Sequence, residues 1–169
     1  MIAKGSLPRR FAAFSLIELM IALVVLGVTA SLAAPTFHEL IQSWRLRTAA
    51  VQMISAIWLA RGTALRSGQN TILCPIQASG CGGQYQESFG VFNEEGTLLR
   101  MYQSRPEIFI TNRRGTRSAT QAVVWNTAGL SSRNMTFLFC TESVGVNWAV
   151  VLNRVGRPRL QRDWGICPD

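Results

Sequence analysis

Residues 14–34 read FSLIELMIALVVLGVTASLAA, and this stretch decides the architecture of the chain. Its 21 residues carry one charged side chain, Glu18, and match the roughly 20 residues that a helix needs to cross a bilayer core. Residues 1–13 before it contain Lys4, Arg9 and Arg10 and no acid. The positive-inside rule therefore predicts a cytoplasmic N-terminus, a single span and an extracytoplasmic remainder.

Helical spacing of apolar residues continues beyond Pro35. Two interleaved apolar sets run from residue 40 to residue 65 with polar residues beside them, and Ser67 and Gly68 form a stop signal. We expect an amphipathic helix over residues 36–67 that continues the membrane helix of residues 14–35, bent or locally opened at Pro35. The two sets are Leu40, Trp44, Val51, Ile54, Trp58 and Leu65, and Leu46, Ala50, Met53, Ile57, Ala60 and Ala64.

Short β-type runs separated by Gly, Asn, Ser and Pro follow Gly68. They predict an α+β fold in which the long helix packs on a mainly antiparallel β-sheet domain, residues 68–169, that ends in a basic tail. Residues 80–84 and 113–120 are expected to be loops. The predicted strands are residues 71–76, 89–92, 97–102, 108–111, 122–126, 135–139 and 148–153. The predicted core contains Trp58, Leu73, Val91, Phe109, Val123, Trp125, Phe137, Phe139, Val150 and Leu152.

The charge balance favours an anionic partner. The chain has 17 Lys+Arg against 9 Asp+Glu, a net charge of +8 and a pI near 10.6, values typical of proteins that bind nucleic acid or lipid surfaces. Lys4 is the one lysine, and such a skew toward arginine can also arise from codon usage. The positions of the arginines must therefore show whether the charge serves an anionic partner. An apolar share of 48% excludes a disordered chain, and its concentration before residue 35 argues against a soluble cytosolic enzyme.

Residue types that perform covalent catalysis are scarce outside the membrane segment. No histidine follows His38 and no lysine follows Lys4, so a hydrolytic triad would lack its base. Glu94 and Glu95, next to Gly96, fit solvated charges of a hairpin turn better than an acid–base pair. We therefore expect a binding or assembly module with no catalytic residue and no cofactor.

Four cysteines lie in the extracytoplasmic part, where the oxidising environment favours two disulfides. A metal site is the alternative, but no pair has C-x-x-C spacing and His38 lies at the membrane exit, so we expect no metal. Three connectivities are open. We favour Cys74–Cys81, which closes a short segment, and Cys140–Cys167, which ties the tail to the sheet.

Glu18 is the fifth residue counted from Phe14. A carboxylate within a span costs about 2.5–3.5 kcal/mol, so it is usually paired or functional, although a position near the interface would also tolerate it. An ordinary secretory signal cleaved after Ala33 is a competing interpretation, since residues 31–33 have small side chains at the right positions. That interpretation gives Glu18 no role.

The segment from Ala13 to Met20 resembles the class III signal of type IV pilins and pseudopilins. The resemblance includes the basic leader, the Phe, the Glu and a proline at mature position 22, here Pro35; Ala13 departs from the usual glycine before the cut. It implies that prepilin peptidase cuts between Ala13 and Phe14 and methylates the new amine. It also implies that Glu18 pairs with the terminal amine of a neighbouring subunit during assembly.

Residues 71–75, 90–92 and 150–159 are similar to the GspH/FimT/FimU group of minor pilins. This resemblance implies the pilin fold and a single-pass protein of the bacterial inner membrane with a periplasmic domain. It further implies incorporation into a pilus or pseudopilus, with other minor and major pilins as partners of the N-terminal helix.

The basic tail contains Gly156-Arg157-Pro158-Arg159, similar to the G-R-x-R element with which FimT-type pilins bind DNA. In an extended segment Arg157 and Arg159 point to the same side, where both can reach phosphates. This predicts sequence-independent DNA binding for uptake in natural transformation. The alternative is an assembly or priming minor pilin, or a type II secretion pseudopilin, that does not bind DNA. The other candidate contacts are Arg154 and Arg162, together with Arg113, Arg114 and Arg117, which could extend the patch or form a solvated loop.

Overall fold

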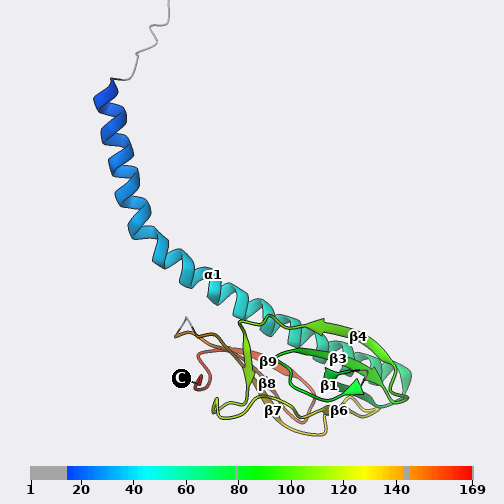
Figure 1. Cartoon of the computed structure of the whole chain (residues 1–169). Helices are drawn as coiled ribbons and strands as arrows, with labels where there is room; N and C mark the ends of the chain where they lie inside the picture. The colour runs from blue at the N-terminus through cyan, green and yellow to red at the C-terminus, as the bar shows by residue number, and fades with distance from the viewer. Residues whose placement is uncertain (1–14, 79, 143–144, 169) are drawn as a thin grey trace, which may run out of the picture. The chain divides into compact units, whose positions relative to one another are not determined.

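The structure, a computed structural model, describes residues 15–78, 80–142 and 145–168 (Figure 1). Its described elements are helix α1 (Leu16–Ser67) followed by strands β1 to β9. The chain divides into two compact units, Met1–His38 and Glu39–Asp169.

Helix α1 has defined signals at both ends. At its start the backbone N–H of Glu18 donates to the carbonyl and hydroxyl oxygens of Ser15 (3.1 and 3.3 Å), which is the first half of a capping box. At its end the N–H of Gly68, with a φ of 65°, donates to the carbonyl of Ala64 (3.1 Å). The predicted stop after Ser67 is confirmed, and the helix continues through position 35.

In the first unit the described side chains of residues 16–31 are exposed. Among the described residues, no helix combines the length and apolarity that a membrane span requires. The predicted cleavage position between Ala13 and Phe14, with the leader before it, lies outside the described residues.

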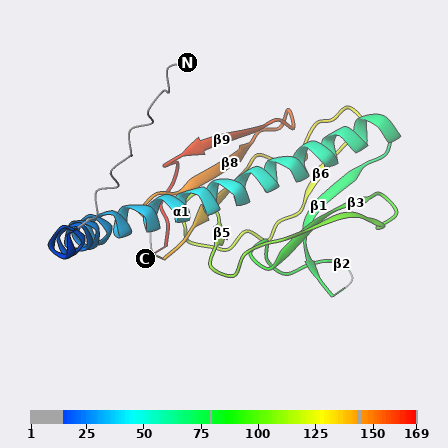
Figure 2. The ribbon, with the colours of Figure 1, turned by 90° about the horizontal axis from the view of Figure 1, so that it is seen from above.

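The second unit contains two antiparallel sheets rather than one, and the second half of α1 runs along both of them (Figure 2). Every strand pairing in the described part of the chain is antiparallel, which confirms the predicted α+β class. The first sheet has the order β2 (Gly80–Cys81), β1 (Thr71–Gln77), β3 (Ser88–Asn93) and β4 (Leu98–Gln103), with β6 (Val123–Trp125) also paired to β1. The second has the order β5 (Phe109–Thr111), β7 (Met135–Cys140), β8 (Trp148–Leu152) and β9 (Pro158–Arg162).

Two of these strands were not expected. Gly80 and Cys81 form β2 inside a predicted loop, and the basic tail forms β9, a full partner of β8.

One face of α1 forms the core with both sheets. Its small residues let the strands come close, and the Thr71 hydroxyl of β1 donates to the helix carbonyl of Ala60 (2.7 Å). The predicted core residues on the strands are buried except Phe109, which is half-buried on the opposite face of the second sheet beside Cys140. The buried helix residues are Leu46, Ala50, Met53, Ala56, Ile57, Ala60 and Ala64.

The prediction that Trp58 belongs to the core is wrong, because its side chain is 46% exposed. Successive helix residues are rotated by about 100°. The buried arc of α1 extends from Ile57 toward the side of Ala56, so Trp58, rotated the other way, falls outside it. It lies instead on a second apolar face of α1, and the guanidinium of Arg61 lies 5.7 Å from its ring.

Two disulfides cross-link the second unit. Cys74–Cys81 joins β1 to β2, and Cys140–Cys167 joins the end of β7 to the C-terminal tail, with Cα atoms 5.5 and 5.8 Å apart. They are the two pairs that the sequence favours.

The pattern Asn-x-x-Gly forms the same tight turn at four places. In each turn the glycine has a positive φ, and its N–H donates to the backbone carbonyl of the asparagine. The side-chain oxygen of the asparagine accepts from the backbone N–H of the residue that follows the glycine. The four turns begin at Asn93, Asn112, Asn126 and Asn153.

Candidate nucleic-acid interface

The tail arginines lie on the hairpin of β8 and β9, which turns at Asn153. The N–H of Gly156 donates to the Asn153 carbonyl (2.9 Å), and the N–H of Arg157 donates to its Oδ1 (3.2 Å). The carbonyl of Arg154 accepts from Ser131 (3.0 Å). Arg154 and Arg157 are therefore exposed side chains on a backbone that hydrogen bonds fix at several points.

Gly156 serves the fold rather than the surface. It is buried with a φ of 77°, and a Cβ at this position would lie 2.4 Å from the Gly129 carbonyl oxygen and 2.9 Å from Nε1 of Trp125. The close backbone approach that this glycine permits is thus to the interior of the protein. Its part in the G-R-x-R pattern is to make the turn from which Arg157 projects.

Strand parity separates the candidate arginines. Arg159 pairs with Val151 and Arg162 pairs with Trp148, so the two side chains leave β9 on opposite faces of the sheet. Arg159 is exposed on the face away from the helix, whereas Arg162 lies on the helix side and forms an ion pair with Asp163 (3.5 Å). The structure therefore does not bring Arg162 together with Arg159.

The loop arginines lie on the Asn112 turn, and the C-terminal tail packs on this turn. The Asn112 Oδ1 accepts from the N–H groups of Arg114 and Thr116 (3.0 and 3.2 Å). The N–H of Ile166 donates to the Arg113 carbonyl (3.2 Å), and the Arg113 guanidinium lies 4.5 Å from the ring of Trp164. Because Cys140–Cys167 holds the same tail, the disulfide and the turn fix each other's position.

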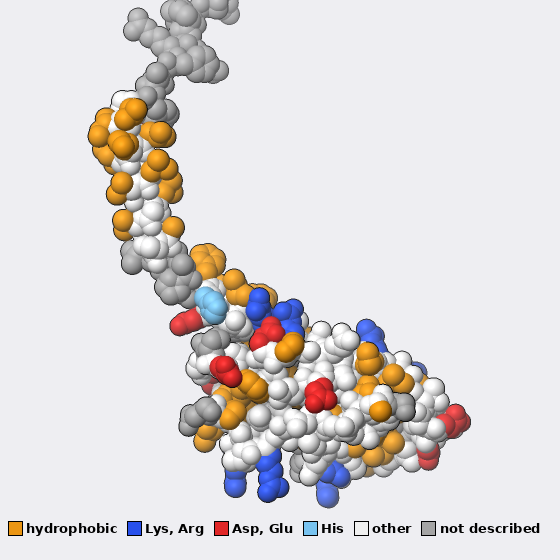
Figure 3. All heavy atoms as spheres, in the orientation of Figure 1, with side chains coloured by type: hydrophobic (Ala, Val, Ile, Leu, Met, Phe, Trp, Pro, Cys, Tyr) orange, Lys and Arg blue, Asp and Glu red, His pale blue; other side chains and the backbone are white. Residues whose placement is uncertain are grey.

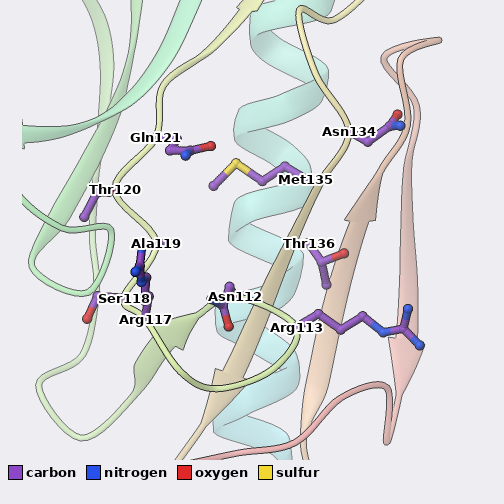
Figure 4. Close-up of a pocket in the computed structure, with 10 residues that line it drawn as sticks. All are labelled: Asn112, Arg113, Arg117, Ser118, Ala119, Thr120, Gln121, Asn134, Met135 and Thr136. Atoms are coloured by element: carbon purple, nitrogen blue, oxygen red, sulfur yellow. The ribbon is translucent and has the colours of Figure 1, made fainter.

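A pocket of about 350 Å³ opens beside the Asn112 turn (Figure 4). Arg117 lines it on one side and Thr136 borders it from β7, while the Arg113 side chain, also part of its lining, extends from the turn away from Arg117. Thr136 pairs with Val151, which pairs with Arg159, so the pocket and the β9 arginine lie in one row across the outer face of the second sheet. Reasoning from sequence missed this row, because it depends on which strands are neighbours.

The arginines of this outer face have no carboxylate partner among the described residues. The ion pairs among the described residues involve three other arginines, Arg45, Arg105 and Arg162. Figure 3 shows arginine side chains projecting from the lower side of the domain, without Asp or Glu side chains between them in this view. This arrangement gives a surface whose positive charge is available to an external anion.

In the described part of the chain, no group of three His, Cys, Asp or Glu side chains is placed to hold a metal ion. Burial raises the pKa of Tyr85, whose hydroxyl donates to the carbonyl oxygens of Leu73 and Gln121 (3.0 and 3.2 Å). Its environment is that of a structural tyrosine.

A long N-terminal helix packed on antiparallel sheets defines the pilin fold, and the comparisons agree with this class. The family model described as "Type II transport protein GspH" matches residues 49–156, and the model "Prokaryotic N-terminal methylation motif" matches residues 8–34. The chain belongs to the GspH family. A search of curated proteins finds no significant match.

Solved structures with the same fold come from two bacteria. The type IV minor pilin FimU of Pseudomonas aeruginosa PAO1, in two crystal forms, superimposes with TM-scores of 0.53 and 0.54 at 14% identity, over 69% and 71% of this chain and 92% and 90% of FimU. The minor pseudopilin EpsH of the Vibrio cholerae type 2 secretion system gives a TM-score of 0.52 at 12% identity, over 69% of this chain and 96% of EpsH.

Proposed function

We propose that this chain is a minor subunit of a type IV pilus or a type II secretion pseudopilus, held in the bacterial inner membrane by its N-terminal helix. The observation that carries the proposal is the apolar surface that α1 leaves uncovered. In the first unit, large apolar side chains are exposed along residues 16–28. Such a helix requires lipid or other helices around it.

The second unit contributes an uncovered stripe, defined here as Trp44, Val51, Trp58 and Leu65. These side chains are spaced seven residues apart and are 45–58% exposed. A seven-residue repeat keeps apolar side chains on one line and suits lengthwise packing against another helix. Since a different face of α1 forms the core, the stripe is available to a neighbouring subunit.

The proposed processing follows the methylation motif matched at residues 8–34. Prepilin peptidase removes the basic leader, residues 1–13, by cutting between Ala13 and Phe14. Residues 14–35 anchor the protein with its N-terminus in the cytoplasm, residues 36–67 form the amphipathic part of the helix, and residues 68–169 form the periplasmic domain. Glu18 pairs with the terminal amine of a neighbouring pilin when the helix leaves the lipid.

Mass spectrometry of the membrane-extracted protein tests the processing. The expected terminus is an N-methylated Phe14, and a terminus at Ala34 would instead identify an ordinary secretory signal. Glu18→Ala should leave the protein in the membrane but reduce its incorporation into filaments, because the anchor remains and the charge partner is lost.

The proposed role within the filament is sequence-independent binding of extracellular DNA for natural transformation. Support comes from Arg154, Arg157 and Arg159, which are exposed on the β8–β9 hairpin without carboxylate partners among the described residues. Contacts to phosphates without an element that enters a groove carry no base code. Arg162 is left out of this contact because of its opposite face and its ion pair.

A second candidate is an assembly or priming subunit, or a type II secretion pseudopilin, that does not bind DNA. The GspH family description and the fold shared with EpsH favour it. Deletion of the gene separates the two. Loss of transformation with intact pili supports DNA binding, whereas loss of pili or of secretion supports the assembly role.

A further inference from the structure

The Arg113–Trp164 contact holds in a fixed place a guanidinium that forms no ion pair with any carboxylate of residues 15–78, 80–142 and 145–168. The guanidinium carbon lies 4.5 Å from the centre of the indole ring, and Arg113 is exposed. A guanidinium stacked on an aromatic face keeps its N–H donors in its own plane, where they remain available to an anion. Stacking therefore orients Arg113 without neutralising it, as a carboxylate partner would.

The backbone that carries Arg113 is equally constrained. Its carbonyl accepts from Ile166 on the disulfide-tied tail, and Asn112 before it holds the turn closed. Gly115 completes the turn with a φ of 67°, and a Cβ there would lie 2.4 Å from the Ile166 carbonyl oxygen. A ligand that binds Arg113 consequently immobilises little that is not already ordered, which lowers the entropic cost of binding.

The pocket beside this arginine presents hydrogen-bond donors and a second cation. Arg117 lies on its wall, and Gln121 on the same wall accepts a hydrogen bond from Nη1 of Arg133 (2.6 Å). No acidic side chain is among the residues that line it. This combination of charge and amide groups suits the oxygens of a phosphate.

The row across the sheet relates the pocket to the proposed DNA contact. Thr136 at the pocket and Arg159 lie two strands apart, about 10 Å at the usual strand spacing. One DNA strand carries a phosphate about every 3.4 Å of helix axis, so a single duplex can reach both positions.

We propose that this pocket seats a backbone phosphate of bound DNA, with Arg113 as its main ligand and Trp164 as the support that orients Arg113. The inference rests on the DNA binding proposed above and extends that contact from β9 across β8 to β7. The DNA then crosses the strands of the second sheet instead of following the basic tail.

The test measures binding of a short labelled duplex to the full-length chain in a non-ionic detergent at several salt concentrations. Arg113→Gln should lower the magnitude of the slope of log affinity against log salt by about 0.9, the value for one lost phosphate contact. The matched control is Arg100→Gln, since Arg100 also stacks on an aromatic ring, Tyr102 at 5.4 Å, but lies on β4 of the first sheet. The control should leave the slope unchanged.

Trp164→Leu tests the support separately from the charge. Arg113 keeps its charge in this variant, so the salt slope should stay at the value of the unchanged protein. The Kd should rise about two- to fivefold, the range that one cation–π contact at an exposed site supplies. Thermal unfolding followed by circular dichroism checks that each variant is folded.

The outcomes separate this inference from the function on which it rests. If Arg159→Gln lowers the slope but Arg113→Gln behaves like Arg100→Gln, the pocket is not a DNA contact and the inference fails alone. If the unchanged protein does not bind the duplex, or if Arg159→Gln, Arg113→Gln and Arg100→Gln all change the slope alike, the proposed DNA binding fails as well.

Inorganic phosphate titrated alone should not saturate the site. Saturable phosphate binding that Arg113→Gln abolishes, with an unchanged DNA slope, would assign the pocket to free phosphate.

Discussion

Gly156 illustrates how far a single residue can be interpreted from sequence. The resemblance to the G-R-x-R element assigns this glycine to the DNA contact, but the pattern does not reveal which atoms pack against it. In the structure the close neighbours are Trp125 and Gly129, 27 or more residues away in the chain. Trp58 is a similar case. Helical spacing assigns it to an apolar face of the helix but does not say which of the two apolar faces the sheets will cover.

We predict that Gly156→Ala destabilises the domain by about 2–6 kcal/mol. An alanine at this position combines the strain of a positive φ with overpacking against Trp125, each a term of about 1–3 kcal/mol. The matched control is Gly96→Ala, in which the glycine of the Asn93 turn has a φ of 81° and open space beside it. That change should cost only about 1 kcal/mol in chemical unfolding, and equal costs for both variants would refute the packing argument.

Tyr85 predicts a specific alkaline response. Because burial raises the pKa of its hydroxyl, the folded chain keeps a proton that the unfolded chain releases above about pH 10. The contribution of Tyr85 to the free energy of unfolding is therefore fully present below about pH 10. Above pH 10 the free energy of unfolding should fall by about 1.4 kcal/mol per pH unit.

The comparison of Tyr85→Phe with Tyr102→Phe checks this response. Tyr85→Phe should remove most of the alkaline loss in urea unfolding experiments, after an initial cost of about 1 kcal/mol for its hydrogen bonds. Burial also raises the pKa of Tyr102, but that residue is less enclosed. A larger effect from Tyr102→Phe would contradict the assignment.

Among the elements, those with strong local signals were predicted and those that depend on distant partners were not. The helix stop at Gly68 and most strands follow from periodicity and turn residues. Strand β9 contains proline and two arginines, and only its pairing with β8 makes it a strand. The four Asn-x-x-Gly turns were visible in the sequence as a repeated pattern, and that signal would have located the Asn112 and Asn153 turns.

The uncovered stripe on α1 separates assembly from folding. We predict that Trp44→Ala combined with Trp58→Ala costs at most about 1–2 kcal/mol in unfolding, because both side chains are exposed and lose mainly their cation–π contacts with Arg47 and Arg61. Incorporation into sheared filaments, measured by immunoblot, should fall strongly.

The control for the stripe is Ile57→Ala on the buried face. It should cost about 2–5 kcal/mol in unfolding, as expected for a large-to-small change in a core. If the tryptophan variant entered filaments as well as the unchanged protein, the stripe would not be an assembly surface.

At the scale of the whole molecule, the division into two sheets could not be foreseen. Strands β6 and β7 are neighbours in the chain but belong to different sheets, and a hydrogen bond from the N–H of Ser131 to the carbonyl of Arg154 joins the β6–β7 connection to the β8–β9 turn. The spacing of β-type runs is the same for one sheet or two. The outer face with Arg113 and Arg159 depends on this division, as does the contact of Trp164 with a turn about fifty residues earlier.

The disulfides predict unequal contributions to stability. In the chain-entropy model, the separation of 27 residues between Cys140 and Cys167 gives about 3.6 kcal/mol, and the separation of 7 between Cys74 and Cys81 gives about 2.3 kcal/mol. Replacing Cys140 and Cys167 by alanine should therefore lower the free energy of unfolding more than replacing Cys74 and Cys81 does, as measured by denaturant titration. The opposite order would show that local packing outweighs loop closure.

The stripe also makes the oligomeric state of the subunit depend on its local concentration. Four side chains along one helix form too small a face to hold two freely diffusing proteins together. For a chain anchored as proposed, confinement to one bilayer raises the local concentration of its neighbours, and weak lateral contacts become effective. Extraction into an excess of detergent micelles reverses that confinement, so the purified subunit should be a monomer whose association returns as the ratio of detergent to protein is reduced.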